Sequence, residues 1–344
     1  MSIMELIKKT IPFFISRIIV YAIFAVASLL FLGLMLGLGI LLFRWFEFAS
    51  FFFILMIVGT FFAVLGILRF VERYFLYMVK VGHIAVVTEL LRTGKVPEGK
   101  NQISYGKDQV VNNFGSANVA FVVDKIIYGA VKQIQRWLMR IGNFLSFVPA
   151  AKKIIGIISK IMEVSLRYVD EAILSYIMLR KSQIAEAAAT AEEGSDSEEE
   201  SVWKSACDGV VLYAQSWKKI VMTAAGIVAF VYILNFVIFI PSVFAFMGIS
   251  SAITSNAGAA AILGWFAIVG AYIVTAMIKR AIVDPIAMIA MVRAYQLNIQ
   301  NIEPNIDLQQ KLLNISSKFK QLFNKRKEDT PQPPTADQGA TSSV

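Results

Sequence analysis

Three long stretches without a charged residue limit the folds that this chain can adopt. They run from Ile18 to Phe43, from Phe48 to Leu68 and from Ile220 to Ile278. A helix needs roughly 20 apolar residues to cross the hydrocarbon core of a bilayer. The first two stretches therefore predict one transmembrane helix each. The third is long enough for two, separated by a polar, turn-prone segment at Met247–Gly258.

The composition agrees with this assignment to the membrane class. The chain is 57% hydrophobic and 17% charged, whereas soluble proteins carry about a quarter charged residues. We therefore expect an all-α integral membrane protein with four transmembrane helices in two hairpins and a cytoplasmic amphipathic helical middle segment. One cysteine, Cys207, and one histidine, His83, are too few for a disulfide or a His- or Cys-based metal site. No catalytic, cofactor or metal residue is assigned, and an enzyme is not expected.

The distribution of charge predicts the orientation of the chain. The net charge is +9, yet the short connections at Arg44–Ser50 and Met247–Gly258 contain little of the basic charge. The positive-inside rule then places both termini and the middle segment in the cytoplasm. The lipid bilayer, with its anionic lipids, is the expected partner. Nucleic-acid binding is not expected, because no supporting motif is present.

Five segments follow from these patterns. They are a first transmembrane hairpin (1–79), an amphipathic or interfacial helical segment (80–184), an acidic linker (185–200), a pre-span helix with the second hairpin (201–300), and an amphipathic helix around Leu308–Phe323 followed by a disordered C-terminal tail (301–344).

The segment Val119–Ile141 has the clearest helical pattern in the middle of the chain. Its apolar residues recur at steps of three and four, and one face carries four cations: Lys125, Lys132, Arg136 and Arg140. One interpretation is a helix on the membrane surface, with these cations near anionic lipid headgroups. The alternative is a helix that packs on its neighbours and turns its basic face to water.

Breaks are expected on both sides of this helix. The Gly-Ser step at Gly115 interrupts two helical stretches, and a turn is predicted at Gly142–Pro149, because proline is unfavourable inside a helix. A second helix, Ile154–Leu179, carries charges at helical steps, among them Glu163 and Arg167. These two residues form either a solvated or ion-paired seam or the lining of a polar path between helices.

Asp284 and Pro285 follow the last uncharged stretch and its closing Lys279–Arg280. We expect the helix to leave the bilayer near Lys279 and to continue from Pro285 as an amphipathic helix. Asp284 would pair with Lys279, Arg280 or a cation of the middle segment, either as a gate or as a helix-end ion pair. Asn235, inside the third predicted span, is either an interhelical hydrogen-bond partner or a substrate contact.

The order of elements from about residue 104 to residue 300 resembles the choline transporter-like family. The resemblance rests on Gly115–Ser116, on the basic run Arg136–Arg140, on Ser205, Ala206 and Asp208 before a span, and on Val283–Asp284 after the last span. It implies transport of a quaternary or primary amine alcohol. Such a cation favours aromatic faces, and Trp265 and Tyr272 are available in the last span.

Two functions remain open from the sequence. The first is a transporter of a small choline-like cation, with Asp284, Asn235, Glu163, Arg167, Trp265 and Tyr272 as candidates for the substrate path. The second is a non-transporting membrane scaffold or complex subunit. Its basic helices would bind anionic lipid, or the chain would associate with a protein partner or a second copy of itself.

Overall fold

The structure is a computed structural model that describes residues 1–45, 51–96, 99, 101–115, 117–143, 149–190, 201–253, 264, 267–268, 271–272 and 274–329. In this part of the chain all regular elements are helices, which confirms the all-α class. The chain forms two compact units. Unit 1 combines Met1–Ala117 with Met222–Ala294, and unit 2 combines Asn118–Val221 with Tyr295–Val344.

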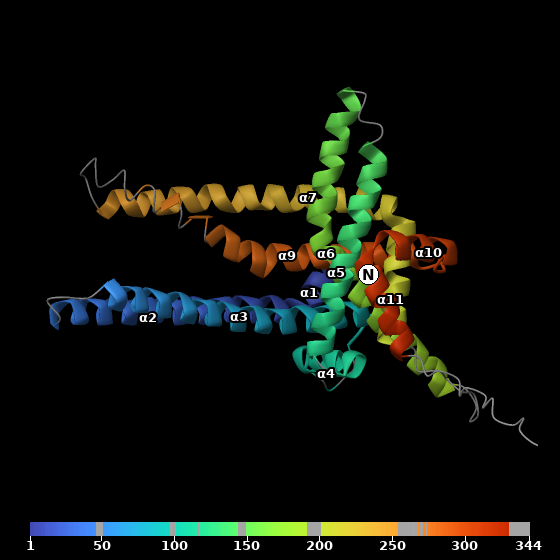
Figure 1. The fold of residues 1–344 in the computed structure, drawn as a ribbon, viewed down its shortest axis with the longest axis horizontal. Coiled ribbons are helices and arrows are strands. Elements are labelled where there is room, and N and C mark those ends of the chain that lie inside the picture. Colours follow the sequence, from blue (N-terminus) through green and yellow to red (C-terminus); the bar gives the residue numbers. More distant parts are fainter. Residues whose placement is uncertain are drawn as a thin grey trace, which may run out of the picture. The chain divides into compact units, whose positions relative to one another are not determined.

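The helices are labelled in Figure 1. Their bounds are α1 Ile3–Lys9, α2 Ile11–Trp45, α3 Phe51–Thr93, α4 Gln102–Phe114, α5 Ala117–Asn143, α6 Pro149–Thr190, α7 Val202–Ile253, the π-helix η1 Lys279–Val283, α9 Asp284–Ile299, α10 Ile306–Ile315 and α11 Ser317–Asp329. The predicted break after α4 is confirmed. Gly115 ends the helix with a positive φ of 68°, and its N–H donates a hydrogen bond to the carbonyl of Val111. Pro149 begins α6, a position where its missing N–H costs nothing.

Two helices among the described residues are long and apolar enough to cross a membrane, Gly66–Thr93 within α3 and Val202–Ile249 within α7. A third candidate arises if the helices on either side of Gly115 are counted together, and Ile11–Phe24 forms a shorter apolar helix. About half of the fourth predicted span, residues 259–278, lies outside the described part. The turn expected at Met247–Gly258 does not start at Met247, because α7 stays helical through Ile253, and the rest of that segment lies outside the described residues.

The outer surface of α7 supports its assignment to a membrane. Large apolar side chains point outward along it, among them Met222, Tyr232, Phe236 and Phe244, each more than half exposed. Water would penalise such a continuous apolar surface, whereas lipid accommodates it.

In unit 1, α2 and α3 lie side by side (Figure 1), and α4 packs against α3. Gly82 and Gly106 permit the second contact. A Cβ atom on Gly106 would lie 2.7 Å from the main-chain oxygen of Gly82. The backbones of α3 and α4 therefore cross at a distance that only glycine allows.

The chain does not break at Pro285. Instead, the five residues of η1 form a π-helix, and the N–H of Asp284 bonds to the carbonyl of Lys279. A wider turn just before a proline accommodates the missing donor and the bulk of its ring. The expected amphipathic continuation is wrong, because most of α9 is buried, including the consecutive residues Ala287, Met288 and Ile289, which point to different sides of the helix.

In unit 2, the apolar face of α5 belongs to a protein core. Val123, Ile127, Val131 and Ile134 have no exposed surface. On the same helix, the amide of Gln135 donates a 2.9 Å hydrogen bond to the Tyr213 hydroxyl of α7. The apolar face of α5 is therefore covered by neighbouring helices of unit 2, as in the interpretation in which α5 packs on its neighbours.

The C-terminal amphipathic helix is two helices rather than one. Ser316 has an extended backbone and ends α10. Its hydroxyl then accepts a 3.0 Å hydrogen bond from the N–H of Phe319, which makes it the N-cap of α11. Phe319 and Leu322 are fully buried and attach α11 to unit 2.

Candidate functional site

The four cations predicted on α5 all face outward. Lys125, Lys132, Arg136 and Arg140 are exposed. Two of them lie over aromatic rings of the same helix, with Lys125 5.2 Å from the Phe121 ring centre and Lys132 5.8 Å from that of Tyr128. The predicted basic face of this helix is therefore present as a surface.

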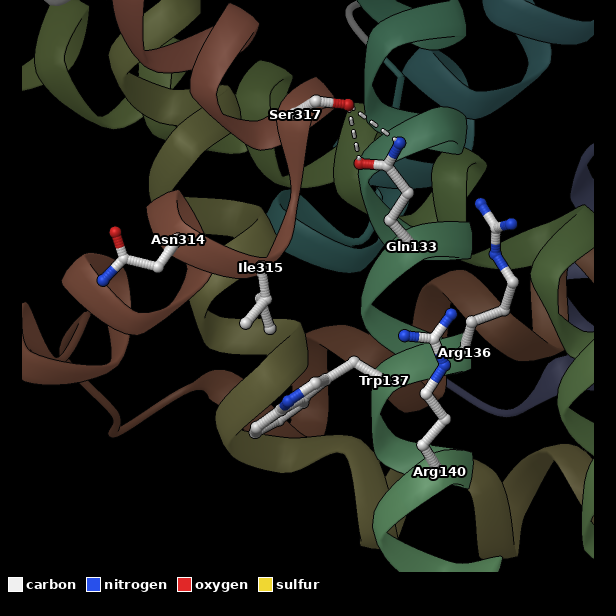
Figure 2. A pocket seen from close by; sticks show the side chains of 7 residues that line it. All are labelled: Gln133, Arg136, Trp137, Arg140, Asn314, Ile315 and Ser317. Atoms are coloured by element: carbon white, nitrogen blue, oxygen red, sulfur yellow. Dashed lines mark hydrogen bonds between the residues drawn. The ribbon is translucent and has the colours of Figure 1, made fainter.

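The C-terminal part of this face forms one wall of a pocket. The pocket is open to the surface, has a volume of about 530 Å³ and is lined by residues of α5 and of the α10–α11 junction: Gln133, Arg136, Trp137, Arg140, Asn314, Ile315 and Ser317. Figure 2 shows both arginine side chains rising from α5, with the Trp137 ring extending beneath Ile315. We call it the α5–α11 pocket.

Gln133 attaches the two walls of the pocket to each other. Its Oε1 accepts hydrogen bonds from the Ser316 hydroxyl at 2.7 Å and from the Lys318 N–H at 3.0 Å. Its Nε2 donates to the Ser317 hydroxyl at 3.1 Å (Figure 2). One amide side chain thus fixes the start of α11 against α5.

The electrostatic character of the pocket is positive. Arg136 and Arg140 lie one helical turn apart, and no carboxylate stands among the described residues that line the pocket. The Arg136 Nε donates to the carbonyl of Lys132 at 3.4 Å. Neighbouring like charges on a helix repel each other by a few tenths of a kcal/mol, so an anion between the two guanidinium groups is favoured.

Unit 1 holds a second group of charges, where the apolar segments of its helices end. Lys279 Nζ and Asp284 Oδ1 form a 2.6 Å salt bridge, which confirms Lys279 as a partner of Asp284. Arg17 of α2 is only 7% exposed, and Arg17, Arg280 and Asp284 all lie in the neighbourhood of Tyr21. α2 packs against both α3 and η1.

The structure describes the side chains of four of the six substrate-path candidates, and these four are distributed over both units. Asp284 joins the charge cluster described above. Asn235 is half-buried, and its Oδ1 has no hydrogen-bond partner among the described residues. Tyr272 is 67% exposed and Glu163 is exposed. Trp265 and the side chain of Arg167 lie outside the described residues.

Four lining residues of the α5–α11 pocket were missed by sequence reasoning: Gln133, Asn314, Ile315 and Ser317. The Ser316–Ser317 pair offered a signal, because serine at the N-cap starts a helix. Nothing in the pattern paired it with Gln133, which lies more than 180 residues away along the chain.

Comparison of the chain with protein-family models, with curated proteins and with solved structures finds no match. The resemblance to the choline transporter-like family therefore stays a prediction.

Proposed function

We propose that this chain is a polytopic membrane protein, with four transmembrane helices in two hairpins, that binds anionic lipid through the basic face of α5. In this proposal both termini and α5 lie on the cytoplasmic side. The protein acts as a scaffold or complex subunit at an anionic membrane surface. The observation that carries the proposal is the exposed Arg136–Arg140 pair in a pocket lined by no described carboxylate.

Physical chemistry supports this function over a purely structural role for the cations. A basic residue near an anionic membrane surface contributes about 1 kcal/mol to binding. The apolar face of α5 is already buried, so the helix contributes charge rather than inserted side chains. Binding of this kind weakens as salt concentration rises.

The test uses the full-length protein in nanodiscs of zwitterionic lipid and measures its binding to anionic vesicles by sedimentation. Arg136→Glu with Arg140→Glu is expected to weaken binding at least about 30-fold, because the loss of two cations alone is the equivalent of about 2 kcal/mol and the new carboxylates add repulsion. The matched control is Lys107→Glu with Lys311→Glu, which changes the same charge at exposed positions elsewhere. Equal loss in both double variants would refute a specific role for α5.

A transporter of a choline-like cation is the second candidate, and the charge cluster of unit 1 favours it. Ionisable groups among apolar transmembrane helices commonly mark substrate or ion pathways, and Asp284 is the carboxylate of this cluster that the sequence also identified. Proteoliposomes should take up labelled choline faster than protein-free liposomes, and Asp284→Asn should slow uptake. Asp307→Asn, at an exposed position of α10, is the control. Uptake equal to that of protein-free liposomes would remove this candidate.

A further inference from the structure

We propose that the α5–α11 pocket is selective for a phosphate monoester carried on a polyhydroxylated headgroup, as in phosphorylated inositol lipids. This inference rests on the proposed function and names its ligand class. Under this proposal, the pocket binds such headgroups more tightly than anionic lipids whose only phosphate is a diester, such as phosphatidylserine.

The first reason is that the pocket is preformed. The hydrogen bonds of Gln133 to Ser316, Ser317 and Lys318 hold the two walls in place. Gly129 adds close contact, because a Cβ atom there would lie 2.9 Å from Cγ of Lys318. A site that is ordered before binding loses less conformational entropy when its ligand arrives.

The second reason is the number and type of cations. A guanidinium group offers a planar pair of donors that matches a phosphate, and Arg136 and Arg140 supply two such groups one turn apart. A phosphate monoester carries close to two negative charges at neutral pH and exposes three terminal oxygens. It can therefore bind both groups, whereas a diester has one charge and two free oxygens.

The third reason is the remainder of the lining. The Asn314 amide and the Ser317 hydroxyl provide neutral hydrogen-bonding groups suited to ring hydroxyls, and Trp137 and Ile315 provide an apolar wall (Figure 2). The volume of about 530 Å³ lies within the range of about 300–1,000 Å³ that is usual for small-ligand sites.

A neighbouring hollow extends the same chemistry along α11. It measures about 370 Å³, shares Ser317 with the first pocket, and is lined further by Lys320, Gln321, Asn324, Lys325 and Glu328. Two lysines against one glutamate leave it cationic. A headgroup with a second phosphate could place that group here, so we expect affinity to increase with the number of monoesters.

The experiment compares two anionic vesicles matched in surface charge. One contains phosphatidylinositol bisphosphate and the other contains phosphatidylserine. Full-length protein in zwitterionic nanodiscs should bind the first about tenfold more tightly, as expected for one additional bidentate contact. Arg136→Lys with Arg140→Lys keeps the charge but removes the planar donors, so it should abolish this preference and retain binding to phosphatidylserine. Both positions are exposed, and circular dichroism checks the fold of the variant.

Soluble probes identify the source of the ligand. Inositol trisphosphate should compete with the bisphosphate vesicles, and glycerophosphoinositol, which has only a diester, should not. Competition at equal affinity identifies a headgroup site that also accepts a free inositol phosphate, whereas weaker competition identifies a lipid site. Both outcomes support the monoester site, and competition by neither compound overturns it.

The two levels of the proposal fail in different ways. Equal binding to the two charge-matched vesicles overturns the monoester inference and leaves the proposed function intact. Binding to neither vesicle overturns both.

Discussion

The hydroxyl of Tyr295 donates a 2.7 Å hydrogen bond to the main-chain carbonyl of Gly209, and both residues are buried in unit 2. The bond joins α9 to α7 across 86 positions of sequence. The packing around Gly209 leaves no room for a side chain. A Cβ atom there would lie 2.9 Å from Cγ2 of Ile173 and 3.1 Å from the ring of Tyr176.

Gly209→Ala should therefore destabilise the protein by about 1–3 kcal/mol, the usual cost of overpacking a core. Thermal unfolding of the detergent-solubilised protein measures it. Gly226→Ala on the same helix has no heavy atom within 4 Å of the new Cβ and should be neutral or stabilising by up to about 1 kcal/mol. Indistinguishable melting temperatures would contradict the packing around Gly209.

Tyr295 predicts a dependence of stability on alkaline pH. Burial holds the pKa of its phenol well above the ordinary value, and Tyr176 and Asp208 raise it further. Above the unfolded pKa of about 10, the unfolded phenol ionises while the folded one stays neutral, so this contribution to stability falls as pH rises. Tyr295→Phe should reduce the loss of stability measured between neutral pH and pH above about 10. An unchanged pH profile would show that this phenol ionises freely.

Gly106→Ala should separate α3 from α4. The new Cβ would lie 2.7 Å from the main-chain oxygen of Gly82, and a backbone atom cannot move aside as a flexible side chain can. We expect a loss of about 2–3 kcal/mol in the free energy of unfolding. Gly66→Ala on α3, where the Cβ meets open space, is the control. If Gly106→Ala lowered the free energy of unfolding no more than Gly66→Ala, the backbones of α3 and α4 would be farther apart than this structure has them.

His83→Phe should leave stability unchanged or increase it. His83 has no exposed surface, and neither ring nitrogen has a hydrogen-bond partner among the described residues. Its ring stacks on Phe13, with centres 4.8 Å apart. Phenylalanine keeps the stacking and removes two buried polar atoms that lack partners, a change that is often neutral or favourable. His83→Ala should instead cost about 2–4 kcal/mol through the cavity it leaves. Thermal unfolding measures both variants, and a large loss of stability in His83→Phe would reveal a polar contact of the imidazole.

Residue spacing alone predicted α5 with its basic face, and the exposure of Arg136 and Arg140 confirms that face. Spacing could not decide what covers the opposite face, because lipid and a protein core both accept Ile127 and Ile134. Likewise, Lys279 was expected as a partner of Asp284, and the salt bridge confirms it. The burial of α9 on most sides depends on tertiary neighbours that no local pattern contains.

The α5–α11 pocket was predictable only in part. Its arginines follow from the periodicity of one helix. Its other wall depends on Ser316 dividing the C-terminal segment into two helices, and on Gln133 accepting hydrogen bonds from the second of them. Pairings over such sequence distances need the fold itself.

The interleaved order of the two units has a consequence for biosynthesis. Unit 1 needs Met222–Ala294, which the ribosome adds only after the whole segment from Asn118 to Val221. At about 5–20 residues per second, the N-terminal part of this unit, Met1–Ala117, waits several seconds or longer for the rest. During that delay, the apolar side chains that later face Met222–Ala294 lack this partner, so lipid or another protein has to cover them.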